Sequence, residues 1–381
     1  MLVVQLKRVC LILAVSVVLW SCSEPSLVAR TIVSGNPPLL SDWGQVGVLN
    51  NRIVLADTVE PYDLASSLFT DYAHKLRTVW MPPGTAAAYR SDDVLEFPVG
   101  TVITKTFYYP RTAIGAKYVR RAPDTSAQLL AGKLGVDAIR LIETRILVRR
   151  ESGWDAIPYR WNEAQTDATL QRTGDIVPLT MVTDTGVEED FSYWVPNVNQ
   201  CSSCHGIDAK SRVLHPIGPK VRHLNKRYHF DTAGVNQLDH WVAAGILEGA
   251  PVSSEWGQNV DWTDQEQALT ARARAYLDIN CSHCHSKQGP ANTSGLHLDP
   301  ATALGPAFGL CKLPIAAGKG TGNRSYDIVP GRPDDSILVH RLESTIPDVM
   351  MPEIGRALRH TEAVSMIRDW VLELDGGCTT G

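Results

Sequence analysis

After its first 20 residues, the sequence has no apolar run long enough to cross a bilayer as a helix. Basic residues are not in excess either, because 36 Lys and Arg face 41 Asp and Glu and the net charge is −5. No basic stripe is present that would favour nucleic acid as a partner. Methionine is scarce, and none of the 6 residues lies between Met181 and Met350. A metal in the middle of the chain therefore has few thioether ligands available.

What the sequence does contain is two CxxCH pentapeptides, at residues 201–205 and 281–285. In a c-type haem site the two thiols form thioethers with the porphyrin, and the adjacent histidine ligates the iron. The repeated motif therefore predicts two covalently bound, redox-active haem c groups. The attachment cysteines are Cys201, Cys204, Cys281 and Cys284, and the axial histidines are His205 and His285.

Two alternatives use the same cysteines. A zinc site built from two CxxC pairs gives no reason for a histidine to follow the second cysteine in both copies. A thioredoxin-like redox pair normally begins a helix in a βαβ pattern, and neither copy has that surrounding. Haem attachment accounts for the repeated histidine and agrees with the export signal at the start of the chain.

The first residues have the pattern of a signal peptide. Lys7 and Arg8 precede an apolar run at 9–20, which is too short to span a bilayer comfortably. The run ends in a leucine, a tryptophan, a serine and Cys22, which resembles the lipobox of bacterial lipoproteins. We expect cleavage after residue 21 and lipidation of Cys22, with ordinary signal cleavage nearby as the alternative.

A multiply acylated N-terminus anchors a protein stably without a transmembrane helix. The sequence therefore predicts an exported lipoprotein on a membrane surface, facing the periplasm, most simply at the outer membrane of a Gram-negative bacterium. Of the 8 cysteines, four lie in the CxxCH motifs, Cys10 is removed and Cys22 is lipidated. The remaining two, Cys311 and Cys378, are expected to form a disulfide in an oxidising compartment, with two unlinked thiols as the alternative.

The chain of 381 residues suggests two or three domains at ~100 to 200 residues each. Residues 31–196 are expected to form a β-rich, sandwich-like domain. Strands are predicted at 101–109 and 140–149, where β-branched and aromatic residues lie between turn residues, and 154–159 completes a hairpin with the second strand. We find no nucleophile, metal or phosphate-binding constellation in this region.

From residue 197 the pattern changes to helices and loops rich in Gly and Pro. We expect two mainly α-helical, cytochrome c-like haem domains, the first and less typical at 197–260 and the second at 261–381. In the second domain, a capping box at 263–266 predicts a helix leading to the haem motif. Thr361 can cap a final helix that ends at the glycines 376–377.

The sixth ligands of the two irons are expected to differ. Met351, followed by proline, is favoured over Met350 as the partner of His285, and His/Met ligation raises the reduction potential. No methionine follows the first motif within its own segment, so an imidazole is expected there, with His215 first. The other candidates are His223, His229, His240 and Lys220. A five-coordinate iron, open to ligands or peroxide, is the alternative.

Several segments resemble known exported proteins. Residues 326–338, 351–352 and 367–370 look like the cytochrome c domain of many bacterial haem proteins. The whole order is similar to a family of mostly uncharacterised exported dihaem c-type cytochrome proteins of Gram-negative bacteria, from about residue 62 to residue 370. The further matching segments are 97–101, 141–145, 161–166, 196–197, 199–201 and 236–238. The resemblance implies haem binding and electron transfer, without an established substrate.

The sequence thus predicts a lipid-anchored dihaem cytochrome that passes single electrons between its haems and an unidentified periplasmic or membrane redox partner. The β-rich domain is expected to scaffold the haem domains or dock the partner, and no side chain is expected to be catalytic. The enzymatic alternative is a dihaem oxidoreductase or peroxidase with an open iron at the first haem. The non-redox alternative is a partner- or carbohydrate-binding module with accessory haems.

Overall fold

The computed structural model describes residues 26–32, 34–208, 210–211, 213–230, 234–315 and 317–378. The predicted signal peptide and Cys22 lie outside these residues. In the described part of the chain, no helix has both the length and the apolar character needed to span a membrane.

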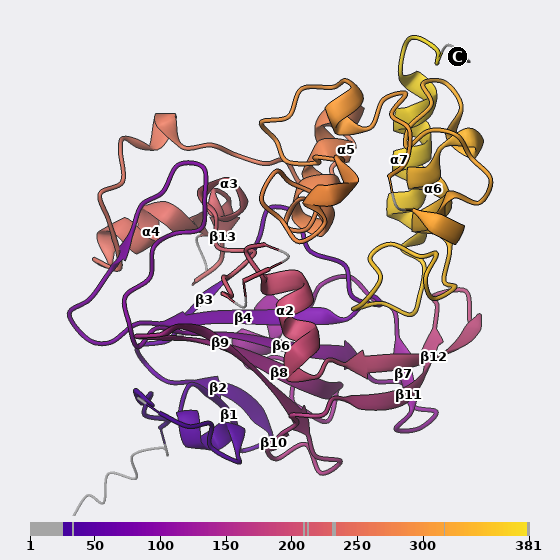
Figure 1. Ribbon diagram of the computed structural model, residues 1–381. Helices are drawn as coiled ribbons and strands as arrows, with labels where there is room; N and C mark the ends of the chain where they lie inside the picture. Colours follow the sequence, from indigo (N-terminus) through magenta and orange to yellow (C-terminus); the bar gives the residue numbers. More distant parts are fainter. Residues whose placement is uncertain are drawn as a thin grey trace, which may run out of the picture.

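An antiparallel sheet of six strands, in the order β10-β9-β8-β6-β4-β3, lies at the centre of the molecule (Figure 1). Its strands are β3 (Glu60–Tyr62), β4 (His74–Trp80), β6 (Val102–Pro110), β8 (Ile139–Arg150), β9 (Gly153–Trp161) and β10 (Ala168–Leu170). β6 and β8 confirm the two predicted strands, and β8 pairs with β9 in the predicted hairpin. These strands form because β-branched and aromatic side chains pack well on a pleated surface.

Both faces of the sheet are buried, and neighbouring residues of one strand enter different cores. Ile146 of β8 packs in a cluster with Trp43, whereas Leu147 packs in a cluster with Trp241. The first cluster lies under the short elements η1 (Leu40–Trp43), β1 (Val46–Leu49), β2 (Arg52–Leu55) and α1 (Ser126–Leu130). The alternation follows from the two-residue period of a strand.

A second sheet continues the fold beside the first. It has three strands, in the order β12-β11-β7. Their bounds are β7 (Tyr118–Arg120), β11 (Asp175–Val182) and β12 (Glu188–Val195). Phe107 and Tyr109 of the central sheet share a hydrophobic cluster with Leu179 and Tyr193 of this second sheet. The β-rich part of the molecule therefore ends directly before the first CxxCH motif.

The prediction of two mainly α-helical, cytochrome c-like domains after residue 196 is wrong. The described chain is β-rich and 23% helical, and its seven α-helices are between 4 and 13 residues long. The segment 197–260 combines short helices with short strands. These are α2 (Val198–His205), α3 (Val221–Leu224), β13 (Arg227–Tyr228), β14 (Val235–Asn236), α4 (Gln237–Ala243), β15 (Leu247–Glu248) and η2 (Ser253–Glu255).

Segment 197–260 also shares its core with the β-rich region. β15 pairs in parallel with β5 (Ala87–Ala88), and one cluster contains Val79 and Ile103 together with Leu238 and Trp241. Helices of four to eight residues cannot enclose a core alone, so their apolar side chains are buried against the sheet. In Figure 1, α2, α3 and α4 lie over the same side of the sheet.

The last segment has its own hydrophobic cluster, but its α-helices are only 9, 7 and 13 residues long. They are α5 (Leu269–Leu277), α6 (Ile337–Glu343) and α7 (Thr361–Glu373), and between them lie η3 (Asp278–Ser282), η4 (Asn292–Ser294), η5 (Pro306–Phe308), η6 (Gly318–Thr321) and η7 (Pro333–Asp335). Most of the segment is therefore turns and loops rather than the helices expected from the sequence.

The two predicted helices of this segment exist, but their predicted caps are wrong. α5 begins at Leu269 after Ala268, whereas Thr263 bonds Asp261 instead of capping a helix. Thr361 is the first residue of α7 rather than its cap, and the helix ends at Glu373, before the two glycines. The expected apolar faces of both helices are buried in the cluster of this segment.

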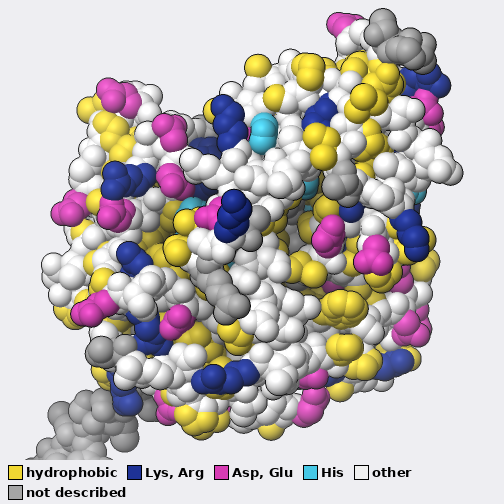
Figure 2. Space-filling model, in the orientation of Figure 1, with side chains coloured by type: hydrophobic (Ala, Val, Ile, Leu, Met, Phe, Trp, Pro, Cys, Tyr) yellow, Lys and Arg dark blue, Asp and Glu magenta, His cyan; other side chains and the backbone are white. Residues whose placement is uncertain are grey.

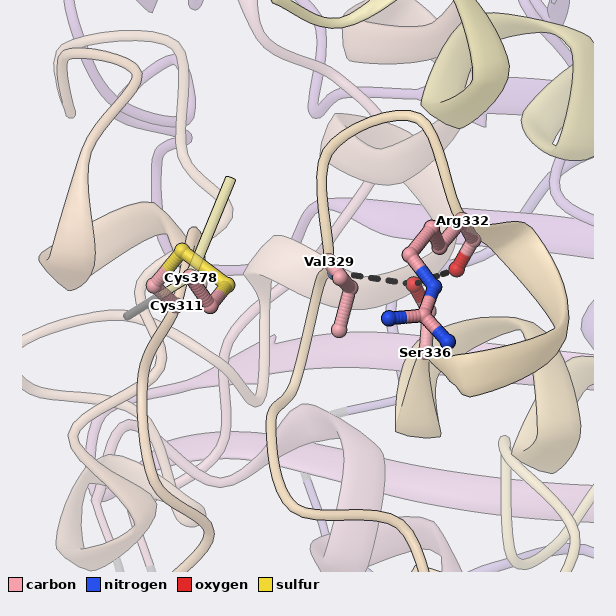
Figure 3. The surroundings of a disulfide bond; sticks show 5 residues. All are labelled: Cys311, Val329, Arg332, Ser336 and Cys378. Atoms are coloured by element: carbon pink, nitrogen blue, oxygen red, sulfur yellow. Dashed lines mark hydrogen bonds between the residues drawn. A yellow bond between two sulfur atoms is a disulfide. The ribbon is translucent and has the colours of Figure 1, made fainter. Parts of the chain in front are cut away.

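Cys311 and Cys378 form a disulfide, the pairing expected from the sequence, with their Cα atoms 5.2 Å apart (Figure 3). Nearby, the Ser336 hydroxyl donates to the carbonyl oxygen of Arg332 and accepts from the backbone N–H of Val329. The disulfide joins the end of the described chain to the loop after η5. The segment that it closes contains α6 and α7.

Candidate functional site

The first CxxCH motif occupies the second half of α2. The side chain of Asn197 accepts from the backbone N–H of Gln200, and the Gln200 side chain accepts from the backbone N–H of Asn197. This reciprocal cap satisfies free donors at the helix start. The helix can therefore begin immediately after Pro196, with no preceding amphipathic helix, and it brings both thiols and His205 within about two turns.

The second motif follows α5 through the turn η3. Within it, the backbone N–H groups of Cys284 and His285 both donate to the carbonyl oxygen of Cys281. Asp278, at the start of this turn, is buried and accepts from the Ser282 hydroxyl at 2.8 Å. The turn is thus held from inside by a carboxylate.

Asp278 also joins the two motif-bearing segments. The Arg222 guanidinium binds it through two nitrogens, Nε at 2.6 Å and Nη2 at 2.9 Å, and Arg222 belongs to α3. Burial alone would raise the pKa of Asp278, but hydrogen bonds from Arg222 outweigh it and lower the pKa well below its usual range. The carboxylate is therefore charged, and the pair fixes the turn before the second motif.

The two motifs touch. The Cys284 thiol donates to the carbonyl oxygen of Ser203 at 3.6 Å, although 81 positions separate them in the sequence. Sequence spacing alone suggested only two sites in tandem. The tertiary structure makes them neighbours over the central sheet.

Each motif lines its own cavity, and the two cavities adjoin. The first is lined by Cys201, Cys204 and His205, and the second by Cys281, Cys284 and His285. The residues common to both linings are Cys204, Asn280, His283, Pro352 and Ile354. The second cavity has a volume of about 480 Å³, in the range of ~300 to 1,000 Å³ typical of ligand pockets, while the first is narrower at about 130 Å³. Figure 2 shows hollows on this face with hydrophobic side chains around them.

Both motif histidines have one ring nitrogen engaged. Nδ1 of His205 donates to the carbonyl oxygen of His215 at 2.9 Å, because a carbonyl can only accept. Nδ1 of His285 lies 3.3 Å from the Ser294 hydroxyl, whose own proton is donated to the carbonyl oxygen of Ala291. Nδ1 of His285 is therefore the donor as well. In both rings Nε2 keeps its lone pair, which is the arrangement of a metal-ligating histidine.

The protonation states agree with ligation and disagree with a redox thiol pair. Burial lowers the pKa of His205 to about 3 and the pKa of His285 to about 4, so both imidazoles are neutral near pH 7. Burial raises the pKa of Cys201 to about 11 and the pKa of Cys281 to about 12. Reactive cysteines of redox pairs have lowered pKa values instead.

The loop after α6 places Met351, but not Met350, at the second cavity. Met351 lines that cavity with His285, whereas Met350 is 5% exposed and absent from the lining. The backbone N–H of Met351 donates to the carbonyl oxygen of Arg341, and the carbonyl oxygen of Met351 accepts from the Arg356 side chain. Hydrogen bonds to the backbone N–H and to the backbone carbonyl of Met351 therefore hold the loop at this residue.

His215 serves the first cavity through its backbone only. Its carbonyl orients His205, and its side chain is absent from the cavity lining. His223 faces Asn259 and Asp278, and His240 stacks on Phe230. His229 and Lys220 are also absent from the lining. None of the imidazoles that the sequence suggested as sixth ligand of the first iron therefore lines that cavity.

The wall of the first cavity carries a set of cations that the sequence did not predict. Arg77, Lys105 and Arg145 line it, and no Asp or Glu does. Arg77 is paired with Asp63 and Arg145 with Glu143, which is fully buried. Among the described residues, no carboxylate lies within ion-pair distance of Lys105. The cavity wall therefore carries positive charge in excess.

Burial lowers the pKa of Lys105 to about 7, with nearby Arg145 and Arg77 lowering it further. The lysine stacks over the ring of Phe107, with Nζ 5.3 Å from the ring centroid. In the sequence, Lys105 is the one charged residue of its strand, so only the alternation of the strand indicated on which side it lies. Which face that side covers depends on the folded sheet.

Among the described residues, no group of three His, Cys, Asp or Glu side chains is arranged to hold a metal ion by itself. Comparisons with protein-family models, with curated proteins and with solved structures found no match to the chain.

Proposed function

We propose that this protein is a dihaem c-type cytochrome that exchanges single electrons with a redox partner. The observation that carries the proposal is the contact between the two CxxCH motifs, each of which lines its own cavity while the cavities share part of their walls. A spacing of one helical turn between thiols suits thioether attachment, and a following histidine suits ligation. Two chance pentapeptides have no reason to meet in this way.

The residues present fit two haem c groups. Cys201, Cys204 and His205 would hold one, and their cavity supplies cations suited to propionate groups. The residues that would hold the other are Cys281, Cys284, His285 and Met351. When bound, each haem supplies an iron that gains or loses one electron.

The chain itself orients the ligands and excludes water. The carbonyl of His215 and the hydroxyl of Ser294 fix the imidazoles of His205 and His285, leaving Nε2 free in each. Asn280 holds the wall between the cavities, because it accepts from the backbone N–H of Phe69 and donates to the carbonyl of Tyr276. The shared wall keeps the two sites close to one another.

A partner can approach the second cavity from the surface. Ile315 lines that cavity and is 55% exposed, so the cavity reaches the surface at this residue. We propose that the partner is a periplasmic or membrane protein, and that Cys22 anchors the chain by lipid to a membrane, most simply the outer one. The β-rich region then acts as the scaffold on which both motifs are held.

The proposal is tested on exported protein from a host with haem c maturation. Mass spectrometry after acid-acetone extraction should show two retained haems. Cys204→Ala and Cys284→Ala should each remove one of them, while Ser202→Ala, which leaves both motifs intact, should retain two. Zinc in place of haem, or no retained haem in the unaltered protein, would overturn the proposal.

A further inference from the structure

His283 lies between the two attachment cysteines of the second motif, yet it lines both cavities. Its Nδ1 atom is buried and has no hydrogen-bond partner. A buried polar nitrogen without a partner destabilises a folded chain unless a ligand satisfies it. The unpartnered nitrogen, together with the place of the ring in both cavity linings, points to a group that is bound in one of the cavities.

The first cavity is the one that lacks a second axial ligand. Among the described residues, which include all 11 histidines, only His205 and His283 line it, and no methionine does. The second cavity already contains His285 and Met351. The free imidazole and the missing ligand thus belong to the same cavity.

We propose that His283 is the second axial ligand of the iron held by His205, and that it binds through Nδ1, its buried nitrogen without a partner. The inference rests on the proposed dihaem function and specifies the ligand set of its first site. A residue of the second motif would then be bound to the iron of the first. The backbone between His283 and Cys284 would connect the two sites through covalent bonds.

A filled sixth position also separates the candidate activities. An iron with two histidine ligands has no open position for peroxide or another small molecule, and it is suited to electron transfer. His/His ligation at the first site and His/Met ligation at the second would give the two irons different potentials, the second being higher. Electrons entering at the first site would then pass to the second.

The test compares His283→Ala with His297→Ala in protein that carries two haems. His297 is a matched control, because its Nδ1 is also buried without a partner but it lines neither cavity. Electron paramagnetic resonance and near-infrared magnetic circular dichroism of the oxidised unaltered protein should show one His/His and one His/Met iron, both low-spin. His283→Ala should convert one iron to high-spin and bind one cyanide per chain, and added imidazole should restore the low-spin signal. His297→Ala should retain both low-spin signals.

Two low-spin irons in His283→Ala would overturn the inference, as would a high-spin or His/Lys iron in the unaltered protein. A His/Lys iron in the unaltered protein would identify Lys105 as the ligand. A high-spin iron would show that the sixth position of the first iron is open. If His283→Ala is not exported in folded form, His283→Met takes its place, and it should replace the His/His signature with a second methionine-to-iron band. Absence of covalent haem from the unaltered protein is a different result, since it refutes the proposed function itself.

Discussion

The Sγ atom of Cys284 lies 3.6 Å from the carbonyl oxygen of Ser203. The first motif ends the helix α2, and the second begins inside η3, so the contact depends on how both elements are placed. In the proposed dihaem protein, a contact of this kind would set the distance between the two redox sites.

Replacing Met351 by alanine should remove the near-infrared methionine-to-iron band and lower one midpoint potential by at least ~0.1 V, a fraction of the ~0.8 V that axial ligands span. The reason is that a thioether stabilises the reduced iron. Met350→Ala is the matched control: it should cost ~2 to 5 kcal/mol of stability as a core cavity while keeping the band. Loss of the band in Met350→Ala alone would assign the ligand to that residue.

Lys105→Met should lower the potential of the first haem in a titration at about pH 5.5, where Lys105 is protonated because that pH lies below its pKa of about 7. A nearby positive charge favours the reduced iron, and one charge at an effective dielectric of about 20 contributes on the order of 1 to 4 kcal/mol, or roughly 40 to 170 mV. Redox titration with spectral resolution of the two haems measures this shift. Lys133→Met, at an exposed lysine that lines neither cavity, should leave both potentials unchanged. Equal shifts at both haems would show that Lys105 does not act on the first cavity selectively.

Asp278→Asn should destabilise the protein by about 3 to 5 kcal/mol, because it leaves the Arg222 guanidinium partly buried without its charged partner. Urea unfolding followed by tryptophan fluorescence measures the change. Asp334→Asn is the control, since the side chain of Asp334, which pairs with Arg368, is 81% exposed. This substitution should lower the stability by less than ~1 kcal/mol. Similar losses in both variants would mean that the Asp278 pair does not secure the second motif.

His360 should make the protein less stable in acid. Burial lowers its pKa to about 3, and its ring stacks on Phe69 at a centroid distance of 4.0 Å. Between pH 6.5 and pH 3 the unfolded chain binds a proton at this residue that the folded chain does not. Stability should therefore fall by up to ~1.4 kcal/mol per pH unit as the pH drops through this range.

His360→Gln should reduce that slope by about one proton, as measured by urea unfolding at several pH values. Tyr72→Phe alters an aromatic neighbour of the same ring and keeps His360 itself. Its slope should match that of the unaltered protein. An unchanged slope in His360→Gln would show that other groups account for the acid sensitivity.

Cys22→Ser should move the protein from the membrane fraction to the soluble periplasmic fraction, or block its processing, because the lipid anchor is lost. Cell fractionation with immunoblotting measures this. Cys311→Ser, which removes a cysteine of the disulfide, should leave the membrane association intact. Membrane association that persists in Cys22→Ser would indicate another mode of attachment.

Elements with a strong local signal were predictable from the sequence. The strands β6 and β8 followed from dense β-branched residues, and the apolar faces of α5 and α7 followed from their helical period. The fold class did not follow, because short helices between Gly-rich and Pro-rich loops look like a helical domain until their burial is known. Their apolar side chains pack on the central sheet, as Trp241 does beside Ile103.

The chemistry of each CxxCH motif is local, so two thiols and a histidine at fixed spacing were enough to predict two haem sites. The methionine–proline pair at 351–352 was likewise visible as a ligand loop. The contact between Cys284 and Ser203, the cation Lys105 on the cavity wall and the position of His283 were not visible. Each of these depends on segments that are far apart in the sequence and are brought together only when the strands pair and the short helices bury their apolar faces against the sheet.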